Sequence, residues 1–255
     1  MKKQIKKWTI RLAVTILLVS GFLIGIVLNP TLLYAHKTIH ENYTVYYNST
    51  LDSNFKIQLY KTTALLKTSE LYNPNVKFDI CLNDGSGYPA FIQKLFPPAF
   101  GVGFYNKIVL MGKTSFTGNY NELHGYKWNL TQLLVHEAIH CLQFKKLGFW
   151  KTQPLAKFPK WKKEGYAEYV ARRSPEQSVL STNIESMAEM EKKGNNDWAI
   201  TFRDGTIAPI EYFRYWILIQ YCIDIKKMTY LQVLQDTTRE EIIREQMMHW
   251  YKAGK

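Results

Sequence analysis

The sequence predicts an α+β fold, in which a mixed β-sheet with two helices forms the N-terminal part and a mostly helical lobe forms the C-terminal part. One transmembrane helix is expected ahead of both. Three observations predict this fold: an apolar segment near the N-terminus, short alternating segments between residues 43 and 111, and helical periodicity from residue 130 onward.

The apolar segment follows a basic cap. The basic residues of this cap are Lys2, Lys3, Lys6, Lys7 and Arg11. Residues 12–28 carry no charge, and residues 12–34 supply the roughly 20 mostly apolar positions that a spanning helix needs, with the basic cap staying cytoplasmic. The alternative is a cleaved signal peptide, but Leu33-Tyr34-Ala35 makes a poor small-residue cleavage site. We therefore expect residues 1–34 to be an uncleaved anchor at the cell membrane. Residues 35–255 would form one extracytoplasmic domain, which is secreted if the segment is cleaved.

Net charge and cysteine content narrow the range of binding partners and metal sites that the sequence predicts. The formal net charge of the chain is +12, and the cap accounts for five of these charges, which leaves +7 on the rest. A moderate basic excess on an exported domain fits anionic membranes or cell-wall polymers, and no nucleic-acid motif is present. Cys81, Cys141 and Cys222 form no C-x-x-C pair, so they do not predict a cysteine zinc site. They predict unpaired buried thiols, with one disulfide outside the cell as the alternative.

Local patterns give the expected order of elements. Residues 35–42 have the composition of a polar connector. Strands are expected at 43–47, at 76–82 and, as a strand or hairpin, at 101–111. Helices are expected at 52–69, near 90–95, from 130 to about 147, up to about 172, at 175–193 and at 210–225, with breaks at 149–160 and 194–197. Thr229, and either Thr237 or Thr238, are expected to cap two final helices.

The segment that carries chemistry is the H-E-x-x-H motif His136-Glu137-Ala138-Ile139-His140. Asn129 and Gly148 are the expected ends of its helix. On a helix, His136 and His140 leave the same face one turn apart, where two imidazoles supply two ligands of a tetrahedral Zn²⁺ site. Glu137 points about 100° away and would act as general base on a water molecule.

A third ligand is needed, because a catalytic zinc site has three protein ligands and one open position. Residues 161–169 read W-x-x-E-G-x-A-E-Y, and twenty-three residues separate His140 from Glu164 in the sequence. That gap suits a loop and a second helix that returns beside the first. The extension H-x-x-G-x-x-H is absent, because Gln143 and Lys146 occupy its Gly and His positions. Glu164 is therefore the expected third ligand.

The two motifs together resemble those of the gluzincins, the zinc peptidases that include thermolysin and aminopeptidase N, and are most similar to the peptidase MA-like domains. The resemblance implies a zincin-like fold for residues 35–255, with His136, His140 and Glu164 as zinc ligands and Glu137 as general base. It also implies that Glu168 orients a ligand histidine. Lys163 departs from the family pattern, which usually has Asn or Asp before the glutamate.

The same resemblance implies two further parts of a peptidase site. Tyr212 or Tyr215 lies roughly where the aminopeptidases contribute a tyrosine to the developing oxyanion. Gly101, Val102 and Gly103 lie where zincins hold the edge strand that pairs with an extended peptide, although an ordinary sheet strand with a glycine bend fits equally. His124 is the other histidine that we expect near the cleft.

We therefore expect a membrane-anchored zinc peptidase that acts on a peptide or protein substrate outside the cytoplasm. Two alternatives remain open from the sequence. One is a membrane-tethered binding module in which zinc is structural, and the other is a zinc hydrolase that attacks a non-peptide cell-wall amide.

Overall fold

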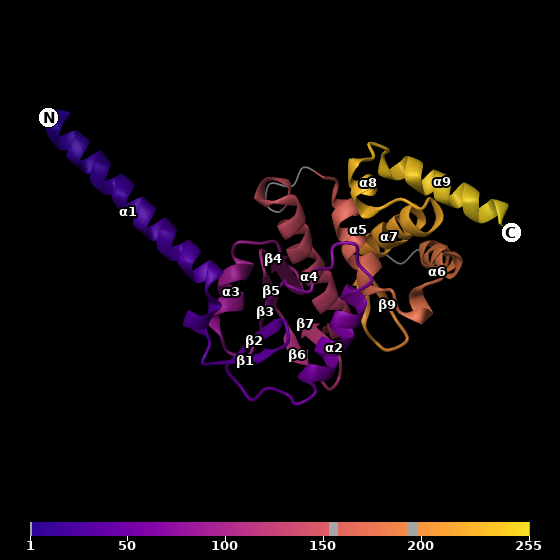
Figure 1. Cartoon of the computed structure of the whole chain (residues 1–255), viewed down its shortest axis with the longest axis horizontal. Helices are drawn as coiled ribbons and strands as arrows, with labels where there is room; N and C mark the ends of the chain where they lie inside the picture. The colour runs from indigo at the N-terminus through magenta and orange to yellow at the C-terminus, as the bar shows by residue number, and fades with distance from the viewer. Residues whose placement is uncertain (1, 153–157, 193–197, 255) are drawn as a thin grey trace.

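The computed structural model describes residues 2–152, 158–192 and 198–254 of a mixed α+β protein. Its first helix, α1 (Lys2–Leu28), extends away from the folded body (Figure 1). Between Lys6 and Leu28 this helix is long and apolar enough to cross a membrane, and its most apolar stretch is not buried against the rest of the protein. The expected class and the single N-terminal apolar helix are therefore both present.

A five-stranded mixed sheet forms the centre of the N-terminal part. Its strands are β1 (His36–His40), β2 (Tyr43–Tyr47), β3 (Phe78–Cys81), β4 (Gly101–Phe104) and β5 (Lys107–Leu110). Their order is β1-β2-β3-β5-β4, with β2, β3 and β5 parallel to one another and both edge strands antiparallel to their neighbours. Strand β4, which contains the three residues expected to pair with a peptide, is thus an edge strand.

Alternating side chains of this sheet enter two separate apolar clusters. Val45, Ile80 and Ile108 face the larger cluster, while their neighbours Cys81 and Val109 face a smaller one. A strand buried on both faces reads as a nearly continuous apolar run. This explains why β3 and β5 are recognisable in the sequence.

The helices cover both faces of the sheet and build the C-terminal lobe (Figure 1). They are α2 (Phe55–Leu66), α3 (Gly87–Gln93), α4 (Leu130–Leu147), α5 (Lys160–Ala171), α6 (Leu180–Lys192), α7 (Ile210–Gln220), α8 (Tyr230–Gln235) and α9 (Glu240–Ala253), with a π-helical turn at Tyr221–Ile225 after α7. Helix α4 packs against α2, β4 and β5 on one side and against α5 on the other, and α5 also packs against α7. Helix α4 therefore joins the sheet to the helical lobe.

Two short sheets were not recognised in the sequence. Strands β6 (Lys113–Ser115), β7 (Tyr120–Leu123) and β8 (Tyr126–Asn129) form an antiparallel sheet, and β9 (Ala199–Thr201) pairs with β10 (Ile207–Pro209). These strands are only three or four residues long, too short to show the alternation that marked the other strands, and those of the β6–β8 sheet are largely polar.

Three other expectations can be compared with the structure. Residues 35–42 were predicted to be a connector, and this is wrong, because β1 occupies most of them as a polar edge strand in which Ile39 is exposed. Thr229 caps α8 with a capping box, whereas α9 begins after Arg239 and not after either predicted threonine. The cysteines are free and buried, as predicted. Residues 153–157 of the predicted break at 149–160, and the whole of the predicted break at 194–197, lie outside the described residues.

Candidate metal centre

Helix α4 presents the two histidines of the motif. The side chain of Asn129 caps its first turn by accepting a hydrogen bond from the backbone N–H of Gln132 at 3.1 Å, and Gly148 ends it with a φ of 80°. Both ends are as the sequence predicts. His136 and His140 lie one turn apart, and their Nε2 atoms are 3.0 Å from each other.

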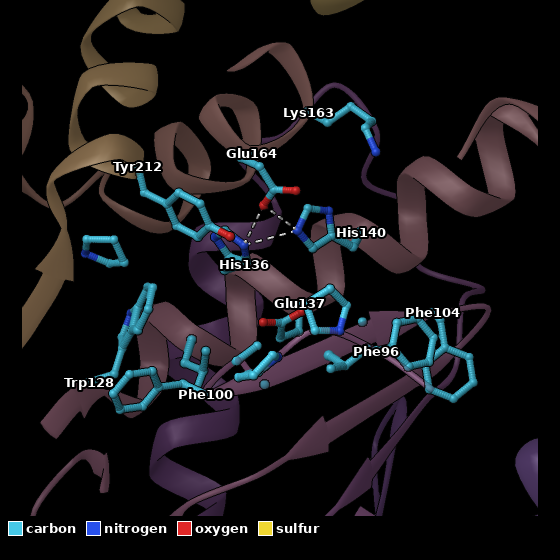
Figure 2. Close-up of a pocket in the computed structure, with 18 of the residues that line it drawn as sticks. Phe96, Phe100, Phe104, Trp128, His136, Glu137, His140, Lys163, Glu164 and Tyr212 are labelled. Atoms are coloured by element: carbon cyan, nitrogen blue, oxygen red, sulfur yellow. Dashed lines mark hydrogen bonds and ion pairs between the residues drawn. The ribbon is translucent and has the colours of Figure 1, made fainter. Parts of the chain in front are cut away.

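Helix α5 brings Glu164 to the same point. Its Oε2 atom lies 3.3 Å from His136 Nε2 and 3.1 Å from His140 Nε2 (Figure 2). The next residue, Gly165, lets α5 lie against α7, because a Cβ atom there would be only 2.5 Å from the carbonyl oxygen of Tyr215. The glycine of the second motif therefore sets the depth at which Glu164 enters the site.

The three donor atoms fit a tetrahedral zinc ion. Zinc bonds of about 2.0–2.1 Å in tetrahedral geometry place neighbouring donors about 3.3–3.4 Å apart. The three separations in this site are 3.0, 3.1 and 3.3 Å, close to those expected values. Burial alone would raise the pKa of Glu164, but His140 and His136 outweigh burial and hold that pKa well below its usual value. Glu164 is therefore ionised, as a metal ligand must be.

Glu137 is the other carboxylate beside the histidines. One of its oxygens lies within 4.8 Å of ligand atoms on both His136 and His140, so it is near this point but less closely placed than Glu164. Burial raises the pKa of Glu137, and a hydrogen bond from the backbone N–H of Gly103 acts in the opposite direction. Its carboxylate is therefore within reach of a group held between the two histidines.

A chain of buried polar groups holds His136 from behind. Its Nδ1 atom lies 2.8 Å from Glu168 Oε1, and the other oxygen of Glu168 accepts a hydrogen bond from Arg172 Nε at 2.5 Å. Burial would raise the pKa of Glu168, but Arg172 and His136 lower it to about 2. Such a carboxylate would fix the imidazole with its Nε2 turned toward the other donor atoms. The structure therefore places Glu168 directly beside His136.

Gln143 plays the corresponding part for His140, which was not predicted. Its Oε1 atom lies 2.9 Å from His140 Nδ1, while its Nε2 donates to the carbonyl oxygen of Lys163 at 3.0 Å and to the hydroxyl of Tyr230 at 2.9 Å. The sequence offered one signal, since Gln143 is three residues after His140 and hence on the same helix face.

The three donors open into a cavity of about 540 Å³ between the sheet and the helical lobe. Aromatic and aliphatic side chains make most of its wall, and β4 lines it along its whole length. Figure 2 shows Trp128 and Tyr212 on one side of the histidines, and Phe104 on the other side. His124, the additional histidine expected near the cleft, also lines this cavity.

The two candidate tyrosines have different positions. The ring of Tyr212 stacks on His136 with centroids 5.6 Å apart and an interplanar angle of 12°. Tyr215 does not line the cavity, and its hydroxyl donates to Glu211 Oε1 at 2.7 Å. Of the two, Tyr212 is therefore the one whose side chain reaches the site.

The structure thus brings together His136, Glu137, His140, Glu164 and Tyr212, with β4 beside them. Comparisons of the chain with protein-family models, with curated proteins and with solved structures found no match. The function must therefore be argued from the chemistry of these residues.

Proposed function

We propose that this chain is a membrane-anchored zinc peptidase with a zincin-like fold, similar to the gluzincins, that hydrolyses peptide bonds on the extracytoplasmic side. The observation that carries the proposal is the meeting of His136, His140 and Glu164 at 3.0–3.3 Å beside a large cavity, with the carboxylate of Glu137 nearby. Helix α1, by its length and composition, supports the membrane anchor.

The arrangement favours a catalytic over a structural ion. Structural zinc sites are closed by four protein ligands, whereas catalytic sites keep a position open. Here three donors converge at the wall of a cavity that is large enough for a substrate side chain and backbone. A binding module that uses zinc only as a brace does not need a cavity at the ion.

Each residue then has a defined task. Bound Zn²⁺ would supply a Lewis acid and lower the pKa of a water molecule from about 15.7 to about 7. Glu137 accepts the proton of the attacking water and passes it to the leaving amine. The hydroxyl of Tyr212 donates a hydrogen bond to the oxyanion that forms at the scissile carbonyl. The edge of β4 aligns the peptide through main-chain hydrogen bonds.

The Glu137→Gln variant tests the proposal. It removes the base but keeps the size of the side chain, so peptide hydrolysis by the full-length protein in detergent should fall about 10²- to 10⁴-fold while zinc stays bound. Glu241→Gln on α9, which alters an exposed carboxylate outside the cavity, is the matched control and should change neither quantity.

Three results would contradict the proposal. The first is full peptidase activity in Glu137→Gln, and the second is a wild-type protein that binds zinc but cleaves no peptide in a broad library. The third is cleavage of cell-wall amides alone, which would assign the same site to a non-peptide substrate.

A further inference from the structure

Lys163 is a buried cation at the wall of the cavity. It lies on α5 immediately before the proposed ligand Glu164, and only 3% of its surface is exposed to solvent. Its side chain extends on the His140 side of the site, opposite Tyr212 (Figure 2). A lysine is rarely buried to this extent without a partner for its charge.

Within the described residues, Lys163 Nζ has no hydrogen-bond or ion-pair partner, although the backbone carbonyl of the same residue accepts from Gln143. The other lysines of α5 differ in this respect. Lys162 Nζ donates to the carbonyl oxygen of Asp236, and Lys160 pairs with Glu211 at 2.6 Å. Lys163 is therefore the lysine of this helix whose charge is left for something that enters the cavity.

The charge balance of the cavity indicates the sign of the charge on a group that would bind beside Lys163. With a divalent ion held as proposed, the carboxylates of Glu137 and Glu164 offset its two charges. Lys160 is offset by Glu211, so the charge of Lys163 is the one left over. In a largely apolar cavity an unbalanced cation attracts an anionic group more strongly than it would in bulk water, because its surroundings screen the charge less.

We propose that Lys163 forms an anion subsite that binds a carboxylate of the substrate on the His140 side of the metal centre. This inference rests on the proposed function for the identity of the substrate as a peptide. Phe104 and Phe144 also line the cavity and suit an apolar group next to the carboxylate. The carboxylate belongs either to the C-terminus of a peptide or to an acidic side chain.

Binding of small probes tests the subsite independently of hydrolysis. In the zinc-loaded, full-length wild-type protein, calorimetry should show 3-phenylpropionate binding about 10- to 100-fold more tightly than 3-phenylpropionamide. Adding Lys163→Met should remove most of this preference, whereas Lys163→Arg should retain much of it. Lys162→Met is the control, since it removes the same charge from the same helix but from a side chain bonded to Asp236.

Parallel experiments with different peptide substrates identify the source of the carboxylate. Peptides with a free or an amidated C-terminus, each with either Glu or Gln at one internal position, should separate the two sources by the ratio of kcat/KM values. A preference that follows the free C-terminus assigns the subsite to a carboxypeptidase-like mode, and one that follows Glu assigns it to an acidic side chain. Either preference should fall about 10- to 100-fold in Lys163→Met.

Two results would overturn the proposal that Lys163 forms an anion subsite. One is equal affinity for the carboxylate and the amide in the protein with Lys163 intact, a measurement that needs no folded Lys163 variant. The other is a carboxylate preference that survives Lys163→Met, which would mean that the metal alone binds the anion. If the wild-type protein hydrolyses no peptide but still prefers the carboxylate probe, the peptidase function is rejected and the anion subsite is retained.

Discussion

At the scale of single residues, each histidine of the proposed metal centre is held through its second ring nitrogen. His136 Nδ1 contacts Glu168, which Arg172 holds in turn, and His140 Nδ1 contacts Gln143. Such partners fix the tautomer and the orientation of the ring, and losing one typically lowers metal affinity 10- to 100-fold.

Replacing Gln143 with Ala tests this at His140. We expect zinc affinity to fall about 10- to 100-fold, because the imidazole loses the contact that orients it. The free energy of unfolding should also fall by about 1–3 kcal/mol, since the carbonyl of Lys163 and the hydroxyl of Tyr230 lose a buried partner. Competition with a chromophoric chelator measures the affinity, and unchanged affinity in a folded variant would show that Gln143 does not orient His140.

The sequence predicts the residues that meet at the proposed metal centre better than the residues that support them. His136, Glu137 and His140 are related by the period of one helix, which the chain shows directly. Gln143 is on that helix too, but its partner Tyr230 is 87 residues away in the sequence. Nothing in the local sequence pattern reveals such a contact. The burial of Arg172 is equally hard to predict from the sequence, because the rings that pack on its guanidinium belong to the distant residues Phe202 and Trp216.

At the scale of elements, the close approach of β4 to α4 depends on two glycines. A Cβ atom on Gly103 would lie 2.2 Å from the backbone carbonyl oxygen of Glu137, and one on Gly101 would lie 3.0 Å from the Glu137 side chain. At both positions the absence of a Cβ atom allows the edge strand to contact Glu137, the proposed general base. These glycines therefore serve close packing, which the sequence-based interpretation as a glycine bend did not anticipate.

The Gly103→Ala variant tests this packing. We expect unfolding to become easier by about 1–3 kcal/mol, because β4 must move away from α4 to make room. Peptidase activity should fall with it, since Glu137 loses both its neighbour and the N–H that it accepts from. Gly87→Ala is the control, because a Cβ atom there meets nothing within 4 Å. A melting temperature of Gly103→Ala equal to that of wild type would refute this account of the strand.

At the scale of the whole molecule, the segment that follows α1 is bound to the folded body. Tyr34 donates to the carbonyl of Leu82 at 2.8 Å, Ser86 donates to that of Leu33 at 2.7 Å, and Tyr88 donates to that of Val27 at 2.6 Å. The end of α1 therefore packs on the sheet face opposite α4, whereas the rest of the helix projects outward (Figure 1). The predicted domain boundary after residue 34 falls inside this contact region.

Two truncations test this arrangement. Removing residues 1–25 should release the protein from membranes and leave its melting temperature within about 2 °C, because the apolar stretch of α1 is not buried against the folded body. Removing residues 1–35 should lower the melting temperature by roughly 4–16 °C, since part-buried hydrogen bonds and the ring of Tyr34 are lost. Equal stability of the two truncated chains would show that residues 26–35 contribute nothing to the fold.

The parts of the fold that the sequence predicts are those with regular burial. Strands β3 and β5 and helix α4 are buried over most of their length, so their apolar patterns are clear. Strand β1 and the β6–β8 sheet are polar and short, and they form through pairing with distant or neighbouring strands rather than through a pattern of their own.

The central claim is that His136, His140 and Glu164 hold one zinc ion while Glu137 does not. Elemental analysis of the purified full-length chain and two variants tests it most directly. We predict about one zinc ion per chain in the wild type and in Glu137→Gln, and a large loss of zinc in Glu164→Ala. Full zinc content in a folded Glu164→Ala variant, or loss of zinc in Glu137→Gln, would contradict the account.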